Sequence, residues 1–313
     1  MTSLLDDYMS KLKLATLMPF ETYEGDVYHY TSLGNASSIL LRSDKMRLWA
    51  SRYDCLNDAS EGTLPKNRFL RACELLKESG TIEEEFYELI KDMCPNRTGL
   101  IVPTIDGKVR SLRDEFKTYV ISFSEDPDAL AMWNYYSKGN RYEGINIGVS
   151  SQAILDSINS SLNASGTMEV QMVKVVYDED EQIEIMKRAI VDLNRNYEPG
   201  CEISVRSCIG PLLSKLKPVF KLSYFSHEKE VRLIVNVFKK FEGRLPISYR
   251  SNAGFVIPYI ELDFAKEAVS RVMLGPSLGD DESKRRQRDV VQEMMESYGY
   301  DALIKYSDIP VRY

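Results

Sequence analysis

The predicted strands of this chain are short and alternate with helices at irregular intervals. Apolar and aromatic runs at 27–30, 46–50 and 119–124 predict strands, and helical patterns lie between them. A regular strand–helix–strand period would instead indicate a doubly wound parallel sheet. We therefore expect an α+β fold, with a single domain over residues 26–313 and an N-terminal helical extension over residues 1–25.

Helical stretches interrupt the predicted domain. Residues 82–94 carry apolar side chains at helical spacing, and residues 180–195 also carry apolar side chains at this spacing. The sequence contains no internal repeat and no Gly/Ser-rich linker. We therefore expect these helices to belong to insertions near 64–115 and 178–217 within the single domain.

Charge and residue usage exclude several classes of protein. The net charge of −7 provides no overall basic field that would attract nucleic acid. The chain begins without the features of a signal peptide, and no stretch approaches the roughly 20 apolar residues of a membrane span. Five scattered cysteines and two histidines disfavour a structural zinc site. We expect a reduced, cytoplasmic protein that has no metal site and does not bind a membrane.

One of the two histidines lies at the end of the first predicted strand, in the sequence His29-Tyr30-Thr31-Ser32. A polar turn and an amphipathic helix follow it. A titratable imidazole at a strand end is well placed to bind a polar ligand. Alternatively, His29 is structural and forms a hydrogen bond to the turn.

A second polar cluster follows the strand that contains Ser122 and Ser124. The next helix carries the aromatic residues Trp133, Tyr135 and Tyr136. These rings could stack on a nucleotide, but burial in or beside the protein core is the commoner role of such aromatic side chains.

A third cluster, at 227–232, contains Glu228, Glu230 and Arg232. In an extended strand these three side chains would share one face. Two carboxylates beside a core require partners. Either Arg232 neutralises them in a surface ladder, or a carboxylate binds sugar hydroxyls and stabilises the positive charge that develops during glycosidic cleavage.

The order of these motifs resembles a bacterial family, domain-of-unknown-function family 2971. The resemblance extends from about residue 26 to the C-terminus, and the family name implies no activity. It rests on His29-Tyr30-Thr31, Asn57-Asp58 with Glu61, Phe123-Ser124-Glu125, Met132-Trp133-x-x-Tyr136, the run 143–148, and Glu228-Lys229-Glu230-Val231-Arg232.

The opening strand and its helix are also similar to the start of ADP-ribosyltransferase-like families. This resemblance implies a bent, split, antiparallel or mixed β-sheet with NAD as the substrate. It assigns the first signature to His29, the middle one to the Ser122–Ser124 strand, and the last to Glu230 or Glu228.

The same resemblance implies a role for each candidate residue. His29, Tyr30 and Thr31 would bind the adenosine ribose or the diphosphate. Arg52 or Arg232 would bind phosphate or would simply pair with the acids. Ser122 and Ser124 would line the cofactor site, and Tyr136 or Trp133 would stack on nicotinamide. Glu230 would stabilise the oxocarbenium-like transition state. Glu228 would activate the acceptor.

These expectations lead to an NAD-consuming ADP-ribosyltransferase or NAD glycohydrolase that acts as a toxin or an anti-phage defence effector. Its acceptor would be a nucleic acid, a protein or water, and a partner protein of a defence system is expected. Two alternatives remain open. One is a non-catalytic nucleotide- or nucleic-acid-sensing module of such a system, and the other is an interaction protein whose polar cluster is structural.

Overall fold

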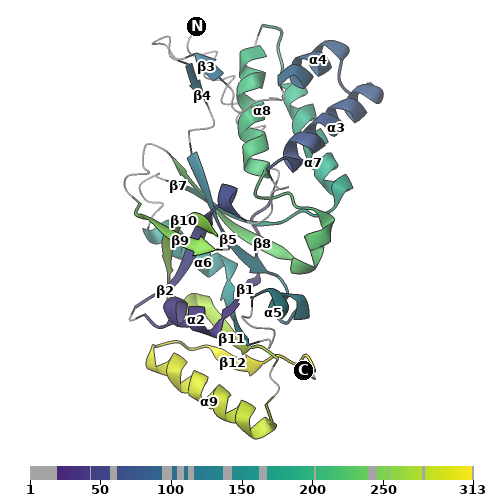
Figure 1. Ribbon diagram of the computed structural model, residues 1–313. Helices are drawn as coiled ribbons and strands as arrows, with labels where there is room; N and C mark the ends of the chain where they lie inside the picture. Colours follow the sequence, from purple (N-terminus) through teal and green to yellow (C-terminus); the bar gives the residue numbers. More distant parts are fainter. Residues whose placement is uncertain are drawn as a thin grey trace. The chain divides into compact units, whose positions relative to one another are not determined.

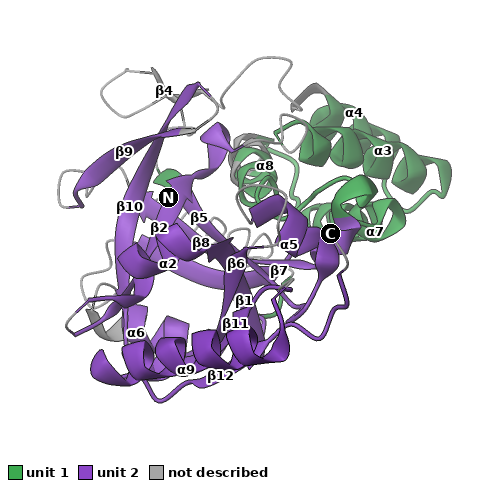
Figure 2. Ribbon diagram, turned by 60° about the horizontal axis from the view of Figure 1, so that its bottom comes forward, with its two compact units in different colours: residues 1–21, 57–117, 175–225 green, residues 22–56, 118–174, 226–313 purple. Residues whose placement is uncertain are grey.

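The computed structural model of the chain describes residues 20–42, 44–56, 62–93, 101–103, 109–111, 116–136, 143–161, 168–200, 202–238, 245–252, 254–276 and 279–311. The helix expected within 1–25 falls largely on residues 1–19, and it lies outside the described residues, as does the Asn57-Asp58 motif. The chain divides into two compact units, coloured separately in Figure 2. Unit 1 comprises residues 1–21, 57–117 and 175–225, and unit 2 comprises residues 22–56, 118–174 and 226–313.

Unit 1 is mainly helical. Asp178 caps α7 by accepting a hydrogen bond from the Glu181 N–H at 2.9 Å, and acidic residues fill the first turn of this helix, where the helix dipole favours them. Apolar residues such as Phe69 and Ile190 are fully buried. The elements of unit 1 are α3 (Leu64–Glu78), α4 (Glu84–Met93), α7 (Glu179–Arg195), α8 (Glu202–Leu216) and the antiparallel pair β3 (Ile101–Pro103) and β4 (Val109–Ser111).

Unit 2 is built on a sheet that has ten strands among the described residues. The order along the sheet is β12-β11-β6-β1-β5-β2-β10-β9, and β8 pairs with both β5 and β7 (Figure 1). Most neighbours are antiparallel, but β11 and β12 are parallel. The strands are β1 (Asp26–Ser32), β2 (Met46–Arg52), β5 (Phe116–Ser124), β6 (Gly144–Ser150), β7 (Met168–Lys174), β8 (Glu230–Phe238), β9 (Ile247–Asn252), β10 (Phe255–Phe264), β11 (Val269–Leu274) and β12 (Leu303–Tyr306).

Helices connect the strands of unit 2. Ser32 ends β1 and caps the next helix by accepting a hydrogen bond from the Asn35 N–H at 3.3 Å. The helices are α2 (Leu33–Leu40), α5 (Leu130–Tyr136), α6 (Ser151–Ser161) and α9 (Asp281–Ser297), with 3₁₀ turns η1 (Tyr53–Cys55), η4 (Ser223–Glu228) and η6 (Lys266–Ala268). The expected α+β class with a mixed sheet is therefore confirmed, and the sheet is open.

The sheet splits at β5, because this strand has three partners and a strand has only two edges. β8 runs antiparallel to β5, as the Thr118–Asn236 side-chain bond and the Glu125 N–H bond to the Lys229 carbonyl show. The other edge of β5 is shared. β2 pairs with it at Val120, whereas β1 pairs with it only at Ser124.

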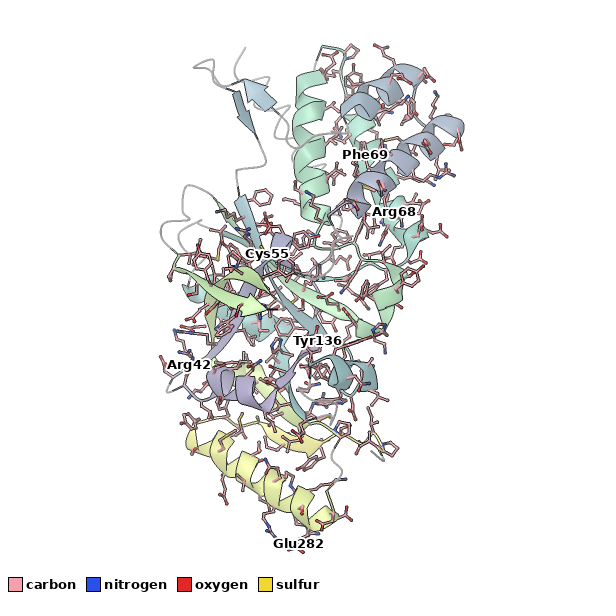
Figure 3. All side chains as sticks on the ribbon, in the orientation of Figure 1. Arg42, Cys55, Arg68, Phe69, Tyr136 and Glu282 are labelled. Carbon is pink, nitrogen blue, oxygen red and sulfur yellow. The ribbon has the colours of Figure 1, made fainter. Side chains whose placement is uncertain are left out.

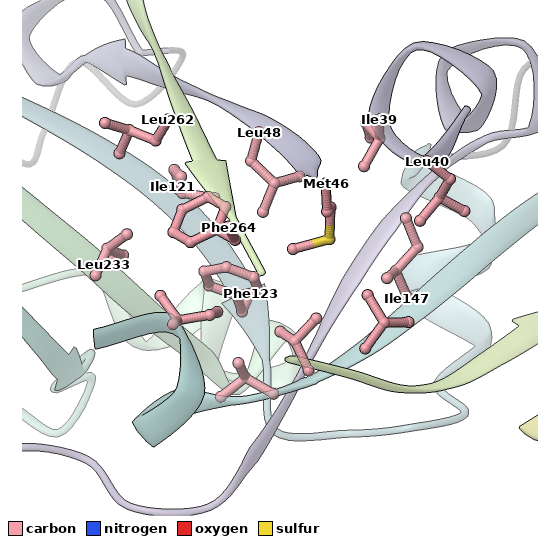
Figure 4. Close-up of a cluster of buried hydrophobic side chains, with 14 of the residues drawn as sticks. Ile39, Leu40, Met46, Leu48, Ile121, Phe123, Ile147, Leu233, Leu262 and Phe264 are labelled. Carbon is pink, nitrogen blue, oxygen red and sulfur yellow. The ribbon is translucent and has the colours of Figure 1, made fainter. Parts of the chain in front are cut away.

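The main core of unit 2 lies on one face of this sheet (Figure 4). Alternate residues of each strand enter it, so the intervening residues point to the opposite face. A smaller cluster on that opposite face contains Tyr28, Tyr30, Met132, Trp133 and Met273. Among the helices that the structure describes, none combines the length and apolar character required to cross a bilayer.

Candidate functional site

A buried ion pair occupies the start of β8. Val231 and Leu233 enter the main core, so Glu230 and Arg232 point to the opposite face of the sheet. The Arg232 Nε donates to Glu230 Oε1 at 2.8 Å, and its Nη2 donates to Oε2 at 2.9 Å. The two side chains are only 2% and 5% exposed, respectively. This two-point contact holds the Glu230 carboxylate in one orientation.

Glu228 does not lie in the strand. It ends the 3₁₀ turn η4, and Lys229 then adopts a positive φ of 42° before β8 begins at Glu230. The expectation that 228–232 form one extended segment is therefore wrong. The left-handed turn at Lys229 breaks the two-residue alternation on which that expectation was based.

The charges of Glu228 and Glu230 nevertheless both act on the hydroxyl of Tyr136. It is the last residue of α5 and is labelled in Figure 3. Burial is the main cause that raises the pKa of its hydroxyl, the charges of Glu228 and Glu230 raise it further, and Arg232 lowers it. The side chain is still 42% exposed, so part of its surface reaches solvent. We call Tyr136, Glu228, Glu230 and Arg232 the Tyr136 cluster.

Two further side chains extend this region. The rings of Tyr135 and His227 lie 5.5 Å apart in a tilted arrangement. Tyr135 is 61% exposed, and His227 is also exposed. The Tyr136 cluster therefore lies next to an aromatic surface that solvent can reach.

Ser124 positions the backbone of this cluster. Its hydroxyl is fully buried, donates to the Glu228 carbonyl at 2.7 Å and accepts from the Asp126 N–H at 3.1 Å. The Glu125 N–H donates to the Lys229 carbonyl at 2.9 Å. Ser124 thus joins the end of β5 to the turn that precedes β8.

Tyr30 and Trp133 hold the loop between β5 and α5. The Tyr30 hydroxyl donates to the Asp126 carbonyl at 2.7 Å and accepts from the Ala129 N–H at 3.0 Å. The Trp133 indole N–H donates to Asp128 at 2.7 Å, and the side chain is 1% exposed. The burial of Trp133 matches the alternative in which these aromatic side chains lie in or beside the protein core.

His29 lies where the sheet splits. Its Nδ1 is 3.1 Å from the Ser122 carbonyl, and because a carbonyl can only accept, the proton is on Nδ1. The carbonyl belongs to the part of β5 between its pairings with β2 and β1. Burial lowers the pKa of His29 below its ordinary value, and the bond to Ser122 partly opposes this shift.

The predicted site residues are therefore divided between two faces of the sheet. Val27 enters the main core, so by alternation His29 and Thr31 point to that face, whereas Glu230 points to the other. Arg52 ends β2, forms an ion pair with Asp54 at 2.5 Å and contacts Cys55 Sγ at 3.3 Å. Ser122 shares the face of Ser124 and is half-buried.

Asp126 and Asp128, in the loop between β5 and α5, also support this part of the structure, although the sequence analysis did not identify them. Asp128 accepts hydrogen bonds from Trp133, from the Ser307 hydroxyl at 2.6 Å and from the Asp308 N–H at 2.9 Å. Asp126 forms an ion pair with Lys229 at 3.1 Å. The signal in the sequence is the pair of acids that flank Pro127, a pattern that is also typical of a helix start. No group of three potential ligand side chains is arranged to hold a metal in the described stretches.

Residues 132–233 match a family described as protein of unknown function (DUF2971), which supports the family expected from the sequence. The matched segment runs from α5 into β8 and contains every member of the Tyr136 cluster. No curated protein and no solved structure matches the chain.

Proposed function

We propose that this protein is an NAD-consuming enzyme of the ADP-ribosyltransferase-like class and that the Tyr136 cluster is its reaction centre. The observation that carries the proposal is the Glu230 carboxylate, which Arg232 orients at two points. Its charge and that of Glu228 both raise the pKa of the Tyr136 hydroxyl. A fixed carboxylate can stabilise an oxocarbenium-like transition state without reorganising during the reaction.

The proposed reaction breaks the bond between the ribose C1′ and the nicotinamide nitrogen. The electron pair of this bond remains on nitrogen, so neutral nicotinamide leaves. Glu230 accepts a hydrogen bond from the ribose 2′-hydroxyl and stabilises the positive charge at C1′. The oxygen of water or of a macromolecular acceptor then bonds to C1′ and transfers its proton to Glu228.

The remaining residues have different parts in this proposal. Ser124 positions Glu228, and Tyr136 contacts the nicotinamide side of the substrate. His29 supports the split of the sheet, since its Nδ1–H already binds the Ser122 carbonyl. We propose a cytoplasmic location, where NAD is available. We propose a toxin or anti-phage effector as the biological role.

Nicotinamide release from NAD tests the proposal. We expect release by the full chain, and a decrease of about 10²-fold or more in Glu230→Gln and Glu228→Gln. Glu261→Gln is the matched control, because it removes a carboxylate from an ion pair on β10, away from the Tyr136 cluster. Absence of release with every acceptor tried (water, RNA, DNA and protein), or equal rates in all variants, would contradict the proposal.

The neutralised state of Glu230 specifically favours one alternative function. A carboxylate that is already paired at two points can serve a site that binds a nucleotide without turnover. In that case NAD would bind, nicotinamide would not be released, and expression in the host would be equally toxic with and without Glu230→Gln.

A further inference from the structure

Arg250 has an unsatisfied donor. It lies in β9 opposite Ile257, on the sheet face away from the main core, and its Nη2 donates to the Ser51 hydroxyl at 3.0 Å. Its Nε is buried without a hydrogen-bond partner, the single such side-chain nitrogen or oxygen among the described residues. A buried donor without an acceptor destabilises the folded state, so an acceptor is missing at this position.

The carboxylates of β10 do not supply this acceptor. Arg47 binds Glu261 at 2.6 Å and also pairs with Asp263. Within the described ranges, no ion pair joins Arg250 to a carboxylate. Burial lowers the pKa of Arg250 below its usual value, and the neighbouring Tyr259 opposes this shift. The guanidinium is thus a partly desolvated cation that forms no ion pair with these acids.

An aromatic pair lies beside Arg250 and Ser51. The rings of Trp49 and Tyr259 stack with centroids 4.5 Å apart and planes 27° apart. Tyr259 pairs with Ser51 across β10 and β2, which brings the stack next to the hydroxyl that Arg250 contacts. Trp49 is 41% exposed, so part of its ring can receive another planar group.

We propose that Arg250 and Ser51 bind the phosphate of a nucleoside monophosphate, and that its base stacks on Trp49. A phosphate oxygen would accept from the orphaned Nε, and planar bases stack readily on exposed indole rings. The net charge of −7 favours one small anion over a polyanionic nucleic acid. This inference concerns binding alone and does not depend on the NAD chemistry proposed above.

Titration of the full chain with AMP, inorganic phosphate and adenosine tests the site. We expect AMP to bind more tightly than either fragment and to change tryptophan fluorescence through Trp49, since Trp133 is only 1% exposed. In Arg250→Met we expect AMP affinity to fall at least about tenfold, because a charge-assisted phosphate contact is lost. We also expect an unchanged or higher Tm, because the variant no longer buries an unsatisfied donor.

Three other variants complete the design. Arg271→Met is the matched control, because Arg271 belongs to β11 and its guanidinium lies over the ring of Tyr28. This variant should bind AMP like the wild type. Ser51→Ala should weaken AMP and phosphate alike, and Trp49→Leu should weaken AMP but not phosphate. These two variants test the site even if Arg250→Met does not fold. The proposal is overturned if the wild type does not bind AMP, if adenosine binds as tightly as AMP, or if neither Arg250→Met nor Ser51→Ala weakens AMP.

Discussion

At the residue scale, the Glu230–Arg232 pair illustrates the free-energy cost of burying two charged side chains at the start of a strand. Both ions are withdrawn from water, and their mutual attraction offsets this cost only while both are present. Removal of one partner leaves a buried charge uncompensated.

We therefore expect Arg232→Met to lower the free energy of unfolding by about 3–5 kcal/mol. The double variant Glu230→Leu/Arg232→Met should recover most of this loss, because no charge is then buried. Denaturant unfolding of the three proteins measures both effects. A double variant as unstable as Arg232→Met would show that the pair does not act as a unit.

His29 links stability to pH. Burial depresses its folded-state pKa below the unfolded value near 6.5, so the unfolded chain binds more protons in this range. The stabilising contribution is complete above about pH 6.5 and decreases as the pH falls toward the folded pKa, by at most about 1.4 kcal/mol per pH unit.

We expect His29→Gln to remove this part of the pH dependence. Unfolding free energies of wild type and variant, measured between about pH 7.5 and 5, should converge as the pH falls. Parallel curves would contradict the assignment. The pH dependence contributed by other groups is common to both proteins and cancels in the comparison.

At the scale of elements, the turn before β8 determines where the carboxylates lie. Lys229 adopts a left-handed conformation, and the buried Ser124 hydroxyl binds the carbonyl of Glu228. β5 and β8 are thus joined at the end where the Tyr136 cluster forms.

Ser124→Ala should destabilise the protein by about 1–3 kcal/mol, since it leaves the Glu228 carbonyl and the Asp126 N–H without this partner. Ser122→Ala is the control on the same strand and face, and it should cost less than about 0.5 kcal/mol. Thermal unfolding compares them. Hydrogen exchange should also increase at 226–229 in Ser124→Ala alone, and equal effects of the two substitutions would contradict this role.

At the scale of the whole molecule, each of the two compact units contains fully buried apolar residues of its own. Phe69 is fully buried in unit 1, and Phe264 is fully buried in the main core of unit 2. A cavity in either interior weakens first the packing of the element that loses the contact.

We expect Phe69→Ala to cost about 3–5 kcal/mol and to increase amide exchange mainly in α3, α4, α7 and α8. Phe264→Ala, a substitution of the same size, should increase exchange mainly in β2, β10 and the strands that pair with them. Hydrogen exchange followed by mass spectrometry distinguishes the two patterns. Uniform exchange in both variants would show that the units open together.

Local patterns were sufficient to predict much of the architecture. Alternation and helical spacing identified the opening strand, the strand that ends at Ser124 and the helices near 82–94 and 180–195, because these signals depend on neighbours within a few residues. They could not predict that β5 has three partners. That outcome depends on long-range pairing between β1, β2 and β8.

The sequence by itself determined the α+β class and the residue types available for chemistry, and it indicated the family that residues 132–233 match. Tertiary structure alone decided which of these residues meet. Glu230 pairs with Arg232 and lies near Tyr136, whereas His29 points to the other face of the sheet and Arg250 keeps an unsatisfied donor. The physical reason is that sheet register and one left-handed turn set the direction of each side chain, and neither can be inferred from local spacing.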